Sequence, residues 1–254
     1  MLTRPVRIDE LTWVQYHELI GQRPVIIPIG AIEQHGTHLP LGTDALCATA
    51  YAEAVSTLNG ALVAPTLSYG YRSIPRSGGG EEFPGTTGLS AQTITATVEE
   101  LLEQFSKDGA RSICVLSGHF ENRIPIHEAA FRFTSRVGDT RIMSMLWGQD
   151  LPLSTLEELY PSGQAFPGFE LEHAAFLETS VMLHLYPRFV QERRSVQEIA
   201  RFPPYDLYPA ALGAIPESGS LAPSMGASAA AGKRLFDDSV AGLVAAMAEA
   251  FGSR

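Results

Sequence analysis

From Val25 to Asp44 the chain reads VIIPIGAIEQHGTHLPLGTD. The apolar run at residues 25–29 is typical of a strand that is buried on both faces, as in the middle of a parallel sheet. It stops abruptly and is followed by Glu33, His35 and Asp44 in a segment rich in glycine and proline. Because ligands bind at the carboxyl ends of the strands in an open parallel sheet, this segment predicts a functional site.

A second stretch has the same design. Residues 112–116 read SICVL, and they are followed at once by SGHFEN at residues 117–122, which contains His119 and Glu121. If the two strands are neighbours, both sets of side chains meet at one edge of the sheet. Imidazole and carboxylate ligands together suit Zn, Mn or Fe. Glu33, His35, Asp44, His119 and Glu121 therefore predict a centre of two metal ions about 3.5–4 Å apart, bridged by an aspartate.

A structural role is the alternative for each of these histidines, since a buried His is often simply hydrogen-bonded. His38, in the same segment, is one histidine more than such a centre needs. It either supports a ligand carboxylate or belongs to the loop structure, and we expect the second.

The rest of the chain alternates between helical and strand patterns. After Ser90, a good N-cap residue, apolar residues recur at helical spacing until Gly109. The patterns predict helices at residues 11–20, 45–58, 90–109, 124–133, 176–185 and 232–251, and strands at 24–30, 62–67, 112–116 and 140–146. Such alternation predicts an α/β fold, a three-layer α/β/α sandwich with a mostly parallel sheet. We expect residues 1–254 to form a single domain.

Composition excludes some classes of function. A net charge of -10 without basic clusters argues against nucleic-acid binding. We expect no membrane partner and a cytoplasmic location, because neither a signal peptide nor a long apolar span is evident. The chain has two cysteines, Cys47 and Cys114, which give no disulfide framework.

Two segments break the alternation of helices and strands. Residues 69–87 are too long for an ordinary connection, which is typical of a functional loop. Its SGGG at residues 77–80 lacks the lysine of a phosphate-binding P-loop, so we expect it to line a pocket. Residues 201–230, rich in Pro, Ala, Gly and Ser, are expected to wrap the surface or a neighbouring subunit.

The segment from Ile29 to Asp44 resembles the signature of the creatininase (creatinine amidohydrolase) family. Similar matches extend along nearly the whole chain. They are YGYR (69–72), SGGG (77–80), FPGTTGL (83–89), SGHFEN (117–122), EH (172–173) with ETS (178–180), and FPPYD (202–206).

The resemblance implies roles for individual residues. Glu33 and His119 would hold one metal ion, His35 and Glu121 the other, with Asp44 bridging two ions of Zn or Mn. His173 falls at the position of the family's catalytic histidine, and Glu121 and Glu178 complete the expected catalytic set. The positions that hold or cover the substrate correspond to Ser77, Phe120, Trp147, Phe169, Glu170 and His173. A homo-oligomer, as in the hexameric creatininase, is also implied.

The chain departs from creatininase proper close to the expected pocket. It has Phe120 in place of a tyrosine, Phe169-Glu170 in place of Trp-Asp, and Glu81-Glu82 in place of Asn-His. Loss of a phenol and of an indole removes hydrogen-bonding groups. Such changes can switch the substrate while the chemistry stays the same.

The expected reaction is the opening of a small cyclic amide, with creatinine and water giving creatine. A metal-activated hydroxide attacks the carbonyl carbon, and His173, which Glu172 or Glu178 could orient, gives a proton to the departing nitrogen. One alternative is a hydrolase acting on another small cyclic or formylated compound, including a carbocyclic ketone. The other is a non-catalytic metal-binding protein, although structural sites are usually closed by four ligands, often thiolates.

Overall fold

The computed structural model describes residues 4–74, 76–161, 165–192, 199–208 and 213–252. Its centre is a five-stranded sheet in the order β1-β3-β2-β4-β5, and every pairing in it is parallel. The strands are β1 (Val6–Arg7), β2 (Val25–Ile29), β3 (Leu62–Val63), β4 (Ser112–Ser117) and β5 (Arg141–Leu146).

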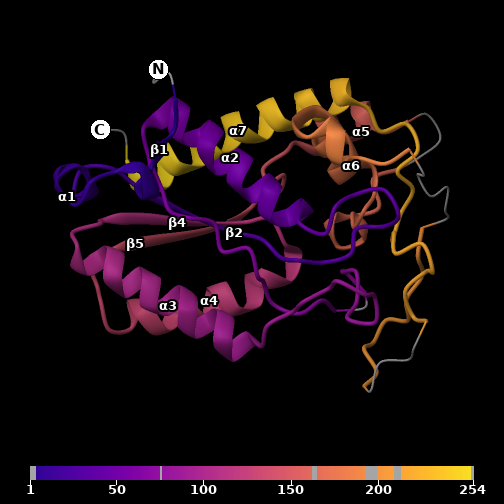
Figure 1. Ribbon diagram of the computed structural model, residues 1–254, viewed down its shortest axis with the longest axis horizontal. Helices are drawn as coiled ribbons and strands as arrows, with labels where there is room; N and C mark the ends of the chain where they lie inside the picture. The colour runs from indigo at the N-terminus through magenta and orange to yellow at the C-terminus, as the bar shows by residue number, and fades with distance from the viewer. Residues whose placement is uncertain (1–3, 75, 162–164, 193–198, 209–212, 253–254) are drawn as a thin grey trace.

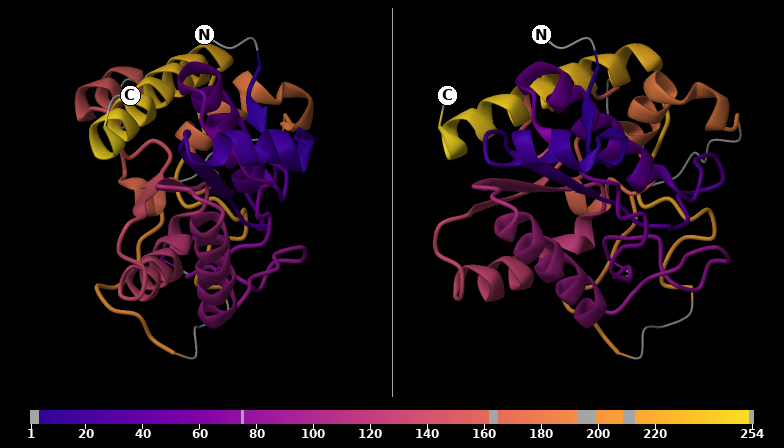
Figure 2. Two further views of the ribbon diagram at one scale, coloured as in Figure 1. Left: turned by 90° about the vertical axis from the view of Figure 1, so that its left-hand side faces the viewer. Right: turned by 60° about the vertical axis from the view of Figure 1, so that its left-hand side comes forward.

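Helices cover both faces of the sheet (Figures 1 and 2). α3 (Ala91–Lys107) and α4 (Arg123–Thr134) lie on one face, and α2 (Thr43–Asn59) and α7 (Ala229–Phe251) on the other. α6 (Phe176–Leu185) packs against α7. The remaining helices are α1 (Trp13–Ile20), α5 (Leu153–Leu159) and the 3-10 helices η1 (Ile8–Glu10), η2 (Phe120–Asn122), η3 (Phe169–Leu171) and η4 (Pro187–Phe189). The predicted three-layer α/β/α fold is confirmed.

Apolar burial on both sides of the sheet holds the layers together. Alternate residues of β2 enter different clusters: Val25, Ile27 and Ile29 face α3 and α4, and Ile26 faces α2 and α7. All five residues of β2 and all six of β4 are buried. The continuous apolar runs in the sequence therefore correspond to strands covered on both faces.

Local chemistry explains where the predicted elements differ from the structure. Ser90 caps α3 as expected, and Ser228 caps α7, which therefore begins before residue 232. The strand predicted at 62–67 ends at Val63, because Pro65 has no N–H to continue the ladder. α2 begins at Thr43, which places Asp44 in its first turn.

Two expectations drawn from composition can be compared with the fold. Cys47 and Cys114 are both buried and free of disulfides. In the part of the chain that the structure describes, no helix is both long and apolar enough to span a lipid bilayer.

The carboxyl ends of β2 and β4 lie side by side, since Ile29 is paired with Ser117. Gly30 and Gly118 follow these strands, and both lie against the first turn of α2. A methyl group on Gly118 would overlap the carbonyl of Asp44, and one on Gly30 would overlap the backbone of Ala45. The two glycines thus let α2 carry Asp44 to the strand ends.

We expect Gly118→Ala to push α2 away from the strand ends and to lower the free energy of unfolding by about 1–3 kcal/mol, the usual cost of overpacking. Chemical denaturation measures this change. The matched control is Gly138→Ala, because Gly138 has no atom within 4 Å of the added methyl group. Equal stability of the two variants would contradict the role given to Gly118.

Candidate active site

Three segments bring the predicted metal ligands to the carboxyl edge of the sheet. Glu33 and His35 lie in the connection from β2 to α2, and Asp44 lies in the first turn of α2. His119 and Glu121 follow β4. All five are at most 4% exposed. The strand ends predicted to converge therefore do converge.

Among the described residues the ligand atoms form three groups, of which one consists of Glu33, His35 and His173 and the other two share Asp44. In the first of these two, Nδ1 of His119 lies 3.1 Å from Oε2 of Glu33 and 3.1 Å from Oδ2 of Asp44. In the second, Nε2 of His35 lies 3.0 Å from Oδ1 of Asp44 and 3.8 Å from Oε2 of Glu178. Each group could hold one ion, since its ligand atoms all lie within 4.8 Å of one another. Asp44 presents one oxygen to each group, as a bridging carboxylate does.

The chemistry of the donors fits a pair of divalent cations. Oε2 of Glu33, Oδ2 of Asp44 and Oε2 of Glu121 are buried and accept no hydrogen bond. An unpaired buried carboxylate oxygen is costly unless a cation meets it. The same set of carboxylates and imidazoles suits Zn or Mn.

The pKa values of the two histidines show that the neighbouring carboxylates favour positive charge in the site. Burial alone would lower the pKa of His35, but Asp44 and Glu178 outweigh it and raise this pKa to about 10. Burial would likewise lower the pKa of His119, but Glu33 and Glu121 raise it well above its usual value. Protons on the two imidazoles thus balance the carboxylates, and metal ions would take their place.

Neighbouring groups hold the ligands in position. The hydroxyl of Ser73 and the backbone N–H of Gly79 donate to Oε1 of Glu33. Nδ1 of His35 donates to the carbonyl oxygen of Glu33 at 3.0 Å, and Nε2 of His119 donates to the carbonyl oxygen of Tyr71 at 2.9 Å. The other two ring nitrogens, Nε2 of His35 and Nδ1 of His119, face the carboxylates and can bind a metal ion.

Glu121 lies beside Nε2 of His119, the ring nitrogen that does not face Glu33 and Asp44. Its Oε2 is 3.4 Å from Nε2 of His119, and its Oε1 accepts hydrogen bonds from the Ser77 hydroxyl (2.7 Å) and the Ile74 N–H (3.3 Å). The structure thus brings Glu178, rather than Glu121, next to His35 and Asp44. The role of Glu121 as a ligand stays a prediction.

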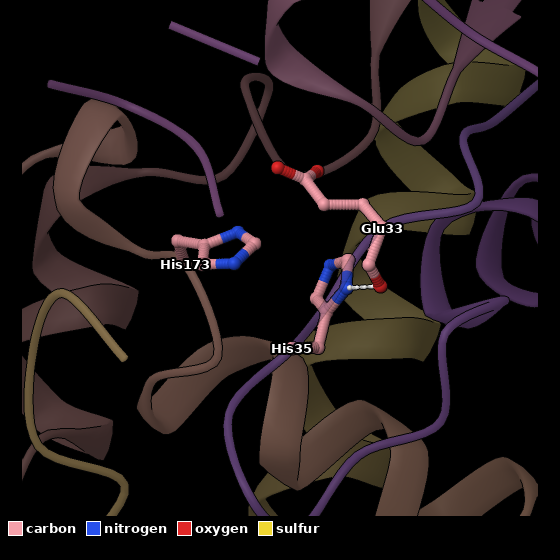
Figure 3. Close-up of side chains that lie close together, drawn as sticks. All are labelled: Glu33, His35 and His173. Carbon is pink, nitrogen blue, oxygen red and sulfur yellow. Dashed lines mark hydrogen bonds between the residues drawn. The ribbon is translucent and has the colours of Figure 1, made fainter. Parts of the chain in front are cut away.

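His173 faces the same cluster (Figure 3). Its ring centroid lies 4.5 Å from that of His35, and its Nε2 donates to the carbonyl oxygen of Gln34 at 2.8 Å. Burial, reinforced by the positive charge of His35, lowers the pKa of His173 to about 4. The ring is therefore neutral at pH 7, with Nδ1 as its unprotonated nitrogen.

The turn after His173 fixes Glu178 as well. Ala174 has a φ of 52°, an uncommon conformation for a residue with a Cβ, and its N–H donates to Oε2 of Glu178 at 2.7 Å. Burial raises the pKa of Glu178 to about 7. Such strain is often found at functional sites.

Sequence reasoning missed Gln34, which ties three segments together. Its side-chain amide donates to the carbonyl oxygens of Gly79 (3.0 Å) and Gly219 (2.9 Å), while its backbone carbonyl accepts from His173. The sequence signal that could have identified Gln34 is its position between the predicted ligands Glu33 and His35. The SGGG segment lies against the cluster through Gly79, as its expected place in a pocket wall requires.

Two cavities adjoin the cluster. The larger, of about 630 Å³, is lined by Ser77, Phe120, Glu121 and the exposed side of α4. The smaller, of about 40 Å³, is lined by Phe120, Trp147, Phe169 and Glu178, among others. Four of the predicted substrate residues therefore line these cavities.

The other substitutions near the expected pocket lie outside both cavities. Glu170 is exposed and lines neither of them. Oε2 of Glu82 accepts from the N–H of Gly213 at 3.0 Å, and Oε1 of Glu81 lies 3.9 Å from Nε of Arg72. His38, expected to be structural, contacts the Thr179 hydroxyl at 2.8 Å.

Comparison with known protein families agrees with this geometry. Residues 9–247 match the family described as "Creatininase: Creatinine amidohydrolase". The chain belongs to the creatininase family. The resemblance seen in the motifs is therefore confirmed, and the chain is a creatininase-family hydrolase.

Relatives within the family differ in activity. The creatinine amidohydrolase of Pseudomonas putida is 37% identical over 259 residues, which cover 98% of this chain and 99% of that protein. A mycofactocin precursor peptide peptidase of Mycolicibacterium smegmatis is 31% identical, over 94% of this chain and 89% of its own. The 3-dehydro-scyllo-inosose hydrolase of Thermotoga maritima is 29% identical, over 75% of this chain and 60% of its own.

Solved creatininase structures have the same fold. A structure described as "Creatininase Mn" is 35% identical and aligns with a TM-score of 0.93 over 98% of this chain and 100% of its own. A creatininase variant of "Zn-Zn type" aligns with the same TM-score at 34% identity, over 98% and 99% of the two chains. Another variant, 35% identical, is complexed with creatine and aligns equally well over 98% and 100% of the two chains.

We expect the purified chain to bind about two Mn or Zn ions, one for each of the two ligand groups that share Asp44. Asp44→Asn should reduce this to less than one ion, because Asp44 belongs to both groups. Metal analysis after dialysis measures the change. Asp139→Asn, at an exposed position, is the control. Two tightly held ions in Asp44→Asn would contradict the shared role of Asp44.

Proposed function

We propose that this chain is a metal-dependent amidohydrolase that opens the ring of creatinine to give creatine. Zn or Mn ions, two per chain, would be held by Glu33, His35, Asp44, His119 and Glu121, with Glu178 beside His35. Ser77, Phe120, Trp147 and Phe169 would line the substrate pocket. These roles rest on the resemblance and on the positions of the side chains.

One observation carries the proposal: Asp44 belongs to two ligand groups, and Oε2 of Glu33 and Oδ2 of Asp44 are buried without hydrogen bonds. A structural metal site is usually closed by four protein ligands. Each group here has three, which leaves coordination positions for water and substrate. The 37% identity to a creatinine amidohydrolase over almost the full chain supports creatinine as the substrate.

Metal ions bound there would lower the pKa of a bound water and polarise the substrate carbonyl. His173 transfers a proton from the attacking water to the departing nitrogen. As a neutral ring it accepts a proton through Nδ1 when the water adds to the carbonyl carbon. When the bond between carbon and ring nitrogen breaks, the same proton passes to that nitrogen, and the carbonyl becomes a carboxyl group that keeps the other proton of the water. Gln34 keeps the ring in the required tautomer through its carbonyl oxygen.

A hydrolase acting on another small cyclic compound is the second candidate. Phe120 lacks the phenolic hydroxyl that creatininase proper has at this position, which favours a different ring in the pocket. A carbocyclic ketone is one such ring, since 3-dehydro-scyllo-inosose hydrolase is among the relatives of this chain. A homo-oligomer and a cytoplasmic location remain predictions.

We expect the chain loaded with Mn or Zn to convert creatinine into creatine, measured by chromatography of both compounds. His119→Ala should abolish turnover, because His119 lies between Glu33 and Asp44. Absence of turnover by folded protein that holds two ions would reject creatinine. It would leave the family hydrolase and direct the search to other cyclic substrates.

His173→Asn should lower kcat about 10²–10⁴-fold, the usual contribution of a general acid–base group, while the metal content stays unchanged. Steady-state kinetics and metal analysis together measure this. His17→Asn, at an exposed position of α1, is the control. A His173→Asn variant with the full kcat would show that another group carries the proton.

A further inference from the structure

Another cavity lies at the opposite edge of the sheet from the candidate metal centre. Its volume is about 460 Å³, which is within the usual range for sites that bind small molecules. It is bordered by residues at the amino ends of β2, β4 and β5 and by the last turns of α7. The carboxyl end of α7 is far from the loops of the candidate active site (Figures 1 and 2). The cavity is therefore separate from the proposed reaction.

The strand register brings three arginines to this cavity. Arg23 lies two residues before β2, Arg111 immediately precedes β4, and Arg141 is the first residue of β5. These strands are neighbours in the sheet, and the backbone N–H of Arg141 donates to the carbonyl oxygen of Arg111 at 3.0 Å. Adjacent strands are roughly 4.8 Å apart. The three side chains thus start close to one another.

Carboxylates do not balance the positive charge of this cavity. None of the described residues that line it is an aspartate or a glutamate, although the whole chain has a net charge of -10. Arginines elsewhere, such as Arg7 and Arg136, form ion pairs with glutamates. None of the three cavity arginines has such a partner among the described residues. Like charges gathered in this way repel one another unless an anion joins them.

Backbone carbonyl groups hold two of the arginines in place. Nη1 of Arg23 donates to the carbonyl oxygen of Gly60 at 3.1 Å. Nη1 and Nη2 of Arg141 donate to the carbonyl oxygens of Ala250 and Phe251. These bonds fix both guanidinium groups, and the dipole of α7 offsets part of the charge of Arg141 alone. Because an arginine has five N–H donors, each group keeps donors for a ligand.

Arg111 is the arginine without a structural task. It is exposed, and its side chain makes no hydrogen bond to any residue that the structure describes. Its contribution to a ligand can therefore be removed without breaking a contact within the chain.

The chemistry of the walls points to a phosphoryl group as the ligand. Guanidinium groups bind phosphate oxygens through paired N–H donors. The two negative charges of a phosphate balance several cations better than the single charge of a carboxylate does. Val244, Met247 and Phe251 of α7 form an apolar part of the wall. An organic group attached to the phosphate would contact that part.

We infer that this cavity binds a phosphoryl group, as free phosphate or as a phosphate monoester, through Arg23, Arg111 and Arg141. The site goes beyond the proposed function and does not depend on it. A ligand bound there joins the amino ends of three neighbouring strands. Since these ends come together only in the folded chain, binding also stabilises the fold.

The test titrates the metal-loaded protein with phenyl phosphate and, separately, with inorganic phosphate, by calorimetry at constant ionic strength, because salt screens exposed charges. Arg111→Gln should weaken binding about tenfold or more, through the loss of a charge-assisted hydrogen bond. Arg111→Lys should weaken it less, because it keeps the charge and loses only the paired donors. Thermal unfolding without ligand should be the same for both variants and the parent.

Arg188→Gln is the matched control. Arg188 is exposed, has no ion pair with a described carboxylate and does not line the cavity. Its removal changes the net charge by the same amount and should leave the affinity unchanged. Equal affinity for the two ligands identifies free phosphate as sufficient, and tighter binding of phenyl phosphate identifies a monoester that uses the apolar wall. Either result supports the site if it depends on Arg111.

Three outcomes overturn the inference. The parent binds neither ligand, or Arg111→Gln binds them as tightly as the parent, which would place the phosphate elsewhere, such as on the metal ions. In the third, Arg188→Gln weakens binding as much as Arg111→Gln, which would be an effect of net charge alone. Creatinine hydrolysis is measured alongside and should be equal in the parent and Arg111→Gln. If neither hydrolyses creatinine while phosphate binding depends on Arg111, the proposed function fails and this inference stands.

Discussion

The buried negative charge at the carboxyl ends of β2 and β4 is the constraint on which the site depends. Asp44 lies within 3.1 Å of both His35 and His119, and its Oδ2 accepts no hydrogen bond. Carboxylates held so far from water require cations. The loops on this side of the sheet place imidazole groups next to these carboxylates, where either a proton on the imidazole or a bound metal ion can balance the negative charge.

Bringing Asp44 to that position constrains the backbone around it. Because Asp44 comes from a helix and its partners from strand ends, α2 must touch both β2 and β4. Gly30 and Gly118 permit this contact, since any side chain there would overlap the backbone of α2. The glycines that end the two apolar runs are thus part of the site, although they carry no chemistry.

The sequence predicted the layers and most ligands because these depend on local patterns. Buried strands read as apolar runs, and the side chains that follow them must share one edge of a parallel sheet. Which carboxylate accompanies His35 could not be predicted in this way. Glu178 lies 3.8 Å from His35, where the N–H of Ala174, a residue with a positive φ, holds its carboxylate, and such a turn has no periodic signal in the sequence.

The long loop between β3 and α3 shows why substrate is harder to predict than chemistry. Ser73, Ser77 and Gly79 all donate to Glu33 or Glu121, so this loop fixes the ligands. The cavity walls at Phe120 and Phe169 come from other segments and make no hydrogen bond to those carboxylates. Substitutions in the walls can therefore change the ring that fits while the ligand groups keep their geometry. A family with a peptidase, a creatinine amidohydrolase and an inosose hydrolase among its members is consistent with that separation.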